Sequence, residues 1–364
     1  MQRKVMTILL AAAIAAATTV SFGQAPQGQQ PPADGRGRGG GQGRGGGAGR
    51  GDGQAPPRGD GQGRGGDARG GQGRGAAAPP PPQAIKMVKP GVYMVINGGG
   101  NSTVRVTDQG VILVDTKNLG DQPYNDLVAQ IKTVTQQPVK YAIITHVHQD
   151  HAGNIERFEK AGVPVIAYAG LNQNLHVGGP NGKGYEAAQG KPADANMPYN
   201  KKNKKVKVGK AEAIAYHFAA GHTSGDTVVY FKDAKVVSLG DEFTATPPNC
   251  DYPMGGSILT WSKSLAEVLK LDFDTAIPGH GNDPMTKADV VTFQKRIDAI
   301  GKKAVELVKA GTAKEQLRAQ IQMSLGAEMG NWQMNNVIAD ARLDAFYQDI
   351  SNAAKNAKGG KKAD

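Results

Sequence analysis

The hydrophobic pattern of this chain changes its period several times between residues 84 and 200. Three short apolar runs come first, "GVYMVIN", "STVRVT" and "GVILVDT", and the Gly and Asn turn signals between them predict β-strands. Residues 121–134 then have a helical period with Leu127 and Ile131 on one face, and the apolar strand "KYAIITH" follows. A second helix begins near His151 and leads to the strand "VPVIAYA". This β-α-β-α-β order predicts a layered α/β domain.

The middle of the chain contains a long irregular stretch and then further strands. Residues 170–200 are rich in Gly and Asn and have no clear period. Irregular loops of this length in compact domains are usually lids or binding loops, so we expect a cover over the substrate here. Strands resume in "KVKVG", "EAIAYHFA", "DTVVYFK" and "KVVSLGD", a helix is predicted over residues 258–271, and the strand "DTAIPGHG" follows.

The pattern is helical from residue 287 to residue 354, and "GTAKEQL" interrupts it and supplies Thr312 as a cap for the next helix. Packing of this extension on its parent domain is the favoured interpretation. Dimerisation through Leu307, Leu317 and Ile321 is the alternative, so the oligomeric state stays open. The predicted organisation is a folded domain over residues 84–285, C-terminal helices over 286–357 and a basic tail over 358–364.

The amino end has the features of a cleaved export signal. Arg3 and Lys4 precede an apolar stretch over residues 5–20, and small residues follow where a signal peptidase would cut. The stretch is too short for a membrane span. The cleavage point has no Cys, so a lipid anchor is not indicated. We therefore expect residues 1–25 to be a signal peptide and the protein to be exported, either periplasmic or secreted.

Residues 26–83 consist mostly of Gly, Arg, Gln, Pro and Ala, which cannot build a core, and this predicts a disordered linker. Arg-Gly tracts that bind RNA usually contain aromatic residues for base stacking, and this one has none, so we expect no nucleic-acid partner. A flexible tether is the favoured interpretation, with weak association of this arm with an anionic envelope surface as the alternative. The net charge of +11 lies mainly in this arm and the two chain ends, so it does not characterise the folded domain.

Histidine and aspartate residues gather where the predicted strands end. The sequence holds a single Cys, Cys250, which excludes an internal disulfide framework. Five of the seven histidines lie at strand ends or in adjoining turns, namely His146, His148, His151, His222 and His280. In "THVHQDHAGN" the strand period places His146 and His148 on one side, so Asp150 and His151 can point to a neighbouring position. One segment can thus serve two metal ions, with further ligands from "AAGHTSGD", "SLGDEF" and "IPGHG".

Imidazole and carboxylate ligands without thiolate favour zinc, with iron and manganese as alternatives. Two zinc ions bridged by a carboxylate and a water would generate hydroxide near neutral pH and polarise a carbonyl or phosphoryl oxygen of a small-molecule substrate.

The order of "HVHQDH", "GHTSGDT", Gly240-Asp241 and Gly279-His280 resembles the metallo-β-lactamase superfamily, and "GVILVDT" is similar to its early strand motif. The resemblance covers about residues 84–284. It implies an αββα sandwich, in which two mixed β-sheets lie face to face, helices cover the outside and metals bind at one edge, here followed by the C-terminal helical extension.

The same resemblance implies a role for each matching residue. The first metal would be held by His146, His148 and His222; the second by Asp150, His151 and His280; and Asp241 would bridge the two. Asp150 would also orient the attacking hydroxide and take its proton. His176 and His217 match no ligand motif, and Cys250 is interpreted as an ordinary thiol.

The substrate class is less closely defined by the resemblance. True β-lactamases of this superfamily generally have a Cys ligand or none at the place of Asp241, so the full set is more similar to glyoxalase II, the lactonases and exported metallo-hydrolases. The export signal argues against glyoxalase II and against the iron-dependent persulfide dioxygenases. The sequence therefore predicts an exported hydrolase with two zinc ions that opens an ester, lactone, thioester or cyclic amide bond by attack of metal-bound hydroxide. A β-lactamase proper and a non-catalytic envelope-binding protein are the alternatives.

Overall fold

The computed structural model describes residues 79–176 and 190–359. The predicted signal peptide, nearly all of the predicted linker, the centre of the expected lid and most of the basic tail lie outside the described residues. None of the described helices is long and apolar enough to cross a bilayer.

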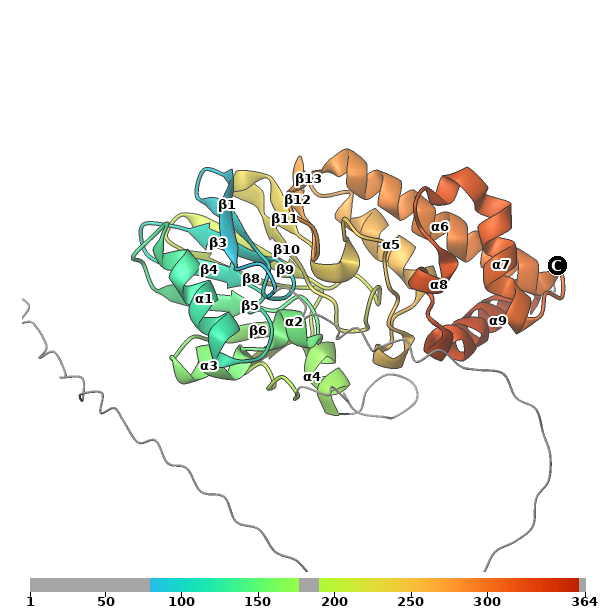
Figure 1. Cartoon of the computed structure of the whole chain (residues 1–364), viewed down its shortest axis with the longest axis horizontal. Helices are drawn as coiled ribbons and strands as arrows, with labels where there is room; N and C mark the ends of the chain where they lie inside the picture. The colour runs from blue at the N-terminus through green and yellow to red at the C-terminus, as the bar shows by residue number, and fades with distance from the viewer. Residues whose placement is uncertain (1–78, 177–189, 360–364) are drawn as a thin grey trace, which may run out of the picture. The chain divides into compact units, whose positions relative to one another are not determined.

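Two mixed β-sheets form the centre of the described chain (Figure 1). The seven-stranded sheet has the order β1-β2-β3-β4-β5-β6-β7, antiparallel up to β4 and parallel from there. Its strands are β1 (Ala84–Lys89), β2 (Val92–Ile96), β3 (Ser102–Val106), β4 (Val111–Val114), β5 (Val139–Ile143), β6 (Val165–Tyr168) and β7 (Met197–Tyr199).

The six-stranded sheet has the order β13-β12-β11-β10-β9-β8, and its β11 and β12 are parallel neighbours while the other pairs are antiparallel. Its strands are β8 (Asn203–Val208), β9 (Ala211–Tyr216), β10 (Val228–Phe231), β11 (Val236–Ser238), β12 (Thr275–Ile277) and β13 (Met285–Thr286).

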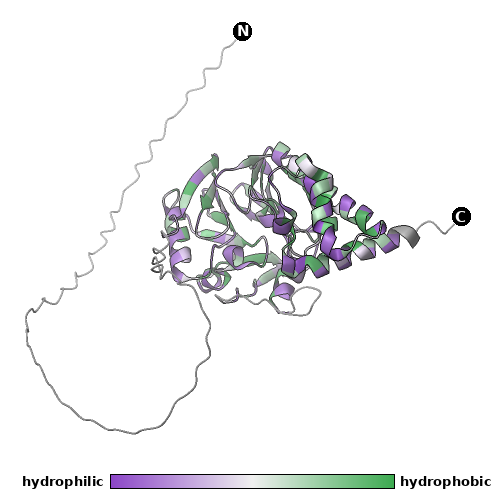
Figure 2. Cartoon of the chain, turned by 45° about the vertical axis from the view of Figure 1, so that its right-hand side comes forward, coloured by the Kyte–Doolittle hydropathy of each residue, from purple (hydrophilic) through white to green (hydrophobic). Residues whose placement is uncertain are grey.

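Helices cover the outer face of each sheet, and the side-chain periods explain why (Figure 1). The helices are α1 (Asp121–Lys132), α2 (Gln149–Ala152), α3 (Ile155–Lys160), α4 (Ala169–His176), α5 (Ile258–Val268), α6 (Lys287–Lys309), α7 (Lys314–Leu325), α8 (Met334–Val337) and α9 (Leu343–Gly359). Leu127 of α1 and Phe158 of α3 are buried against the first sheet, and Trp261 of α5 and Ile297 of α6 against the second. The outer helices accordingly carry hydrophilic segments beside hydrophobic ones (Figure 2).

The space between the sheets is filled by alternating strand residues from both. Ile143 and Ile166 of the first sheet share one buried cluster with Val229 and Phe231 of the second. This layering, helix on sheet on sheet on helix with a C-terminal helical extension, confirms the predicted αββα sandwich.

The expected lid over residues 170–200 is wrong at both of its ends. Residues 169–176 form α4, in which Leu171 and Leu175 are buried in the core of the first sheet, and residues 197–199 form β7. Leu171 and Leu175 are four positions apart and lie on one helical face, a period that the surrounding Asn and Gly residues obscure.

Other sequence predictions missed short or half-exposed elements. The edge strands β1, β7 and β13 were not predicted. The sequence of β1, "AIKMVK", has no regular alternation of apolar and polar residues, and β7 and β13 span only three and two residues. The predicted Thr312 cap is also wrong. Helix α7 starts after Ala313, which makes no side-chain cap, and Thr312 Oγ1 donates to Gln320 Oε1 at 3.1 Å instead.

Helix α6 packs on the second sheet and on α5, and α7 and α9 pack on α6. Leu317 and Ile321 of α7 are fully buried in one cluster with Trp261 and with Val237 of β11. Thr286 begins α6 with a capping box to Asp289, which fixes where the extension leaves the sheet.

Candidate metal centre

Four chain segments bring histidines and aspartates to one edge of the sandwich. His146 and His148 follow β5, and Asp150 and His151 lie on α2 directly after them. The remaining residues of the site lie in the loop before β10 (His222), in the 3₁₀ turn Gly240–Glu242 after β11 (Asp241) and after β12 (His280). Because parallel neighbours such as β11 and β12 end at the same edge, side chains that follow them in the chain meet there.

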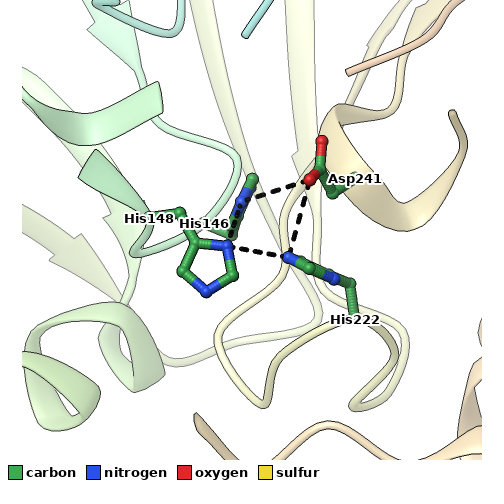
Figure 3. Close-up of side chains that lie close together, drawn as sticks. All are labelled: His146, His148, His222 and Asp241. Atoms are coloured by element: carbon green, nitrogen blue, oxygen red, sulfur yellow. Dashed lines mark hydrogen bonds and ion pairs between the residues drawn. The ribbon is translucent and has the colours of Figure 1, made fainter. Parts of the chain in front are cut away.

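Three imidazole nitrogens converge in the first group, which is drawn in Figure 3. His148 Nδ1 lies 3.2 Å from His146 Nε2 and 2.9 Å from His222 Nε2. Asp241 Oδ2 lies 4.0 Å from His146 Nε2 and 3.7 Å from His222 Nε2. The four ligand atoms all lie within 4.8 Å of one another, which is compact enough for one ion to reach them all.

The second group consists of Asp150, His151 and His280, with ligand atoms again within 4.8 Å of one another. Asp150 Oδ2 lies 3.2 Å from His280 Nε2 and 3.6 Å from His151 Nε2. The two imidazole nitrogens lie 3.4 Å apart.

Asp241 lies between the groups and turns one oxygen to each. Its Oδ2 faces His146 and His222, and its Oδ1 lies 3.3 Å from His151 Nε2 and 3.4 Å from His280 Nε2. Oδ1 is buried and has no hydrogen-bond partner among the described residues. Buried carboxylate oxygens are nearly always paired, so this oxygen is arranged for a partner of another kind.

The partners of the outer ring nitrogens determine the tautomers of the first group. His148 Nε2 donates to Asp251 Oδ2 at 2.7 Å, and His222 Nδ1 donates to the Asn249 carbonyl oxygen at 2.5 Å. Thr145 gives its hydroxyl proton to Asp115, so its oxygen accepts from His146 Nδ1 at 3.1 Å. With the outer nitrogens protonated, the inner nitrogens present three converging lone pairs. Such an arrangement is repulsive by itself and matches the coordination shell of a cation.

The second group is held in the same way. Asp115 Oδ2 accepts from His151 Nδ1 at 2.7 Å, so Nε2 of His151 is directed at the site. The ring of His151 also packs against Gly100, where an added Cβ would come within 2.1 Å of it. Gly100 is therefore required for this close approach of the backbone to the imidazole.

The surroundings shift the pKa values of the ligand residues in different directions. Burial, and then the neighbouring His148, lowers the pKa of His222 to about 4, and burial followed by His151 lowers the pKa of His146. Burial opposes ionisation of Asp241, but His151 and the other imidazoles outweigh it and hold the pKa of that carboxyl well below its usual range. For His280, burial lowers the pKa, but the nearby carboxylates of Asp150 and Asp241 outweigh it and raise the pKa to about 9. The carboxylates thus favour positive charge between them, as a divalent cation would supply.

The ligand residues differ in exposure. His146, His151 and His222 are buried, whereas the side chains of His280 and Asp150 are 35% and 32% exposed. Among the described residues, Asp150 and His280 are thus the ligands most accessible to solvent.

All seven residues that the sequence predicts for the site are brought together by the fold. His217 lies elsewhere, stacked on Tyr168 with its Nδ1 donating to the Asp226 carbonyl oxygen, and His176 pairs with Asp194. Cys250 is a buried free thiol.

Sequence reasoning missed the residues that orient the histidines. Asp115 belongs to the strand motif "GVILVDT", and its place directly after β4, the parallel neighbour of β5, could have indicated its role. Asn249 and Asp251 come from an irregular loop and gave no signal in the pattern.

Comparison with known proteins agrees with this geometry. The model of the metallo-β-lactamase superfamily matches residues 95–280, about half of the chain. The chain belongs to the metallo-β-lactamase superfamily. It is a metal-dependent hydrolase of that family with a His/Asp metal-binding site, and its two groups of ligands are consistent with a dinuclear centre.

Two relatives are metallo-β-lactamases. Metallo-β-lactamase IND-1 of Chryseobacterium indologenes is 27% identical over 194 residues, which are 52% of this chain and 75% of the relative. Metallo-β-lactamase type 2 of Elizabethkingia meningoseptica is 29% identical over 151 residues, and the match covers 41% of this chain and 55% of that relative.

Solved structures show the same fold at lower identity. The sec-alkylsulfatase Pisa1 from Pseudomonas sp. superposes with a TM-score of 0.59 at 18% identity, over 78% of this chain and 52% of that one. DIM-1 metallo-β-lactamase gives 0.50 at 19% identity, over 60% of this chain and 98% of that one. The present chain thus spans about half the length of the sulfatase, and at these identities the likeness concerns the fold alone.

Proposed function

We propose that the protein is a hydrolase with two zinc ions that opens an ester, lactone, thioester or cyclic amide bond. The observation that carries the proposal is the position of Asp241, which turns one carboxylate oxygen to each of two ligand groups. Two groups that share one carboxylate suit two adjacent cations rather than two separate sites.

The donor set supports zinc. The seven side chains offer imidazole nitrogens and carboxylate oxygens, and the single thiol, Cys250, is outside both groups. These ligands suit zinc before iron or manganese. When bound, such ions act as Lewis acids that activate water and polarise the bond under attack.

The residues of the chain would divide the remaining work. His146, His148 and His222 would hold one ion, while His151, His280 and Asp150 would hold the other. Asp150 is more exposed than Asp241, with 32% of its side chain exposed against 13%, so it is the carboxylate that could accept the proton that an attacking water loses.

A β-lactamase proper is the second candidate, and the two relatives favour it, since both are metallo-β-lactamases. Asp241 opposes it, because true β-lactamases generally have a Cys ligand or none at this place. Both candidates include export, which rests on Arg3, Lys4 and the apolar residues 5–20.

A substrate panel tests the proposal. The zinc-loaded full chain would be assayed with a chromogenic cephalosporin, an aryl ester, a lactone and a thioester, each with and without a chelator. We expect chelator-sensitive turnover of about 10⁴ M⁻¹s⁻¹ or more on at least one acyl substrate, the low end of ordinary enzyme efficiency. Highest efficiency on the cephalosporin would favour the β-lactamase, and no turnover on any substrate with two ions bound would contradict both.

Two variants separate the metal centre from other histidines. His148→Ala should lose bound zinc and most turnover. His176→Ala changes an exposed histidine that pairs with Asp194 away from the site, and it should keep both.

Deletion of residues 26–83 distinguishes a hydrolase from a non-catalytic envelope-binding protein. A hydrolase should keep its turnover on soluble substrate without this arm. A non-catalytic envelope-binding protein would instead lose its function with the arm.

A further inference from the structure

The loop over residues 249–257 supports two of the metal-facing histidines from behind. The Asn249 carbonyl oxygen accepts from His222 Nδ1 at 2.5 Å, and the Asp251 carboxylate accepts from His148 Nε2 at 2.7 Å. The position of this loop therefore controls where both imidazoles point.

The same loop is bonded to the C-terminal extension at several points. The Cys250 N–H donates to the Val337 carbonyl oxygen at 3.1 Å. Asp349 of α9 accepts from Ser257 Oγ at 2.7 Å and from Tyr252 Oη at 3.2 Å. The family match ends at residue 280, so these contacts come from a part of the chain that lies beyond it.

Arg342, the last residue of the 3₁₀ turn Asp340–Arg342, brings a positive charge to this loop. Its Nη2 lies 3.6 Å from Asp251 Oδ2, the oxygen that accepts the bond from His148. That distance exceeds a hydrogen bond, so the interaction is electrostatic. The Asp251 side chain is only 9% exposed and the Arg342 side chain 19%, so water screens the pair weakly.

Nη1 of Arg342 is buried and has no hydrogen-bond partner among the residues that the structure describes. A buried guanidinium nitrogen without a partner costs free energy. Hydrogen bonding of Nη1 therefore does not explain why Arg342 lies here. Electrostatic attraction to the nearby Asp251 carboxylate is the interaction that can offset this cost.

We propose that Arg342 is a positioning residue of the metal centre, which acts through Asp251 on His148. Arg342 holds the Asp251 carboxylate in place, and Asp251 keeps His148 turned so that Nδ1 faces the ion. The C-terminal extension then contributes to the geometry of the metal centre. This inference rests on the proposed metal centre.

The first test measures zinc affinity of the full chain by competition with a chromogenic chelator. Replacement of a residue that orients a metal ligand typically weakens metal affinity by about 10- to 100-fold. Because Arg342 acts one residue further away, we expect Arg342→Met to weaken binding of one ion by about tenfold, the lower end of that range. Arg342→Lys keeps the charge and should recover most of the loss.

Arg157→Met is the matched control. Arg157 also pairs with one aspartate, Asp121, at 2.7 Å, and its side chain is 26% exposed, but it touches neither ligand group. This variant should bind zinc as the unchanged protein does. If Arg342→Met does not fold, as judged by circular dichroism, Arg342→Gln answers the same question with a shorter side chain that is polar and uncharged.

A second measurement separates positioning from a merely structural role. Asp251→Ala should itself weaken zinc binding by about 10- to 100-fold. Adding Arg342→Met to it should then have no further effect, since the residue through which Arg342 acts is gone.

Three results would overturn the inference. Unchanged affinity in Arg342→Met, with two ions bound to the unchanged protein, would overturn this inference and leave the metal centre intact. An equal loss from Arg342→Met with and without Asp251 would assign Arg342 a structural role only. No zinc bound to the unchanged protein would overturn the metal centre as well.

Discussion

Asp115→Asn should reverse the tautomer of a metal-facing histidine without removing an atom from the core. Asp115 is 1% exposed and accepts three bonds, from Thr145 N at 2.7 Å, Thr145 Oγ1 at 2.8 Å and His151 Nδ1 at 2.7 Å. In the variant, the amide oxygen can still accept from Thr145 N. The amide NH₂ then faces His151 Nδ1, so the imidazole must accept there and carry its proton on Nε2, which is directed at the site.

The magnitude follows from what is lost at each place. His151 can change tautomer, but the Thr145 hydroxyl loses its acceptor on Asp115. The free energy of unfolding of the metal-free protein should therefore fall by about 1 to 3 kcal/mol, the cost of leaving one buried polar group without a partner. The metal, in contrast, loses one imidazole lone pair. Loss of such an orienting partner costs about 10- to 100-fold in affinity, which corresponds to about 1.4 to 2.7 kcal/mol.

The assay is a zinc titration of metal-free protein against a competing chelator, with urea unfolding measured in parallel. We expect the binding step of the Asp150/His151/His280 group to weaken more than the other step, which Asp115 affects only through Thr145 and His146. Asp194→Asn is the control, because Asp194 also pairs with a histidine, His176, at 2.7 Å but at an exposed position outside both groups. Two unchanged binding steps in Asp115→Asn would refute the reasoning.

Three further predictions concern packing and charge. Gly279→Ala would place a Cβ 2.1 Å from Asp241 Oδ1, so it should displace that carboxylate and lower the number of zinc ions counted per chain by elemental analysis. Phe346→Ala removes a fully buried ring of α9 and should lower the free energy of unfolding by about 3–5 kcal/mol in urea. Burial raises the pKa of Asp226 to about 7, and burial followed by the Asp226 charge raises the pKa of Glu242 well above its usual value. Over this range the folded state binds more protons than the unfolded state, so stability should fall as pH rises. Glu242→Gln should flatten that fall, measured as the melting temperature of the zinc-loaded protein from about pH 5 to 8; an equally steep fall would contradict it.

The metal-facing residues were predictable because their chemistry is tied to strand ends. His146, His148 and His151 are dense in sequence, and Asp241 and His280 each follow a short apolar run. The end of a strand determines both where a side chain lies and which way it points. The type of the side chain and its position in the hydrophobic pattern are therefore enough to predict that several such side chains meet at one edge of the sheets.

The supporting residues depend on contacts that no local period encodes. Asp251 and Asn249 lie in a loop, and Arg342 reaches that loop from 91 positions further along the chain. The error at residues 170–200 has another cause. Only two apolar residues, Leu171 and Leu175, indicate a helix there, and their Asn and Gly neighbours favour a loop. In the fold, burial of the two leucines stabilises the helix.

Stepwise zinc loading of the metal-free full chain, with hydrolysis of an acyl substrate followed at each step, tests the central claim most directly. The two ligand groups joined by Asp241 predict no turnover in the metal-free protein and a maximum at two ions per chain. Turnover that is complete without metal, or a chain that binds two ions and hydrolyses none of the acyl substrates, would contradict the proposed function.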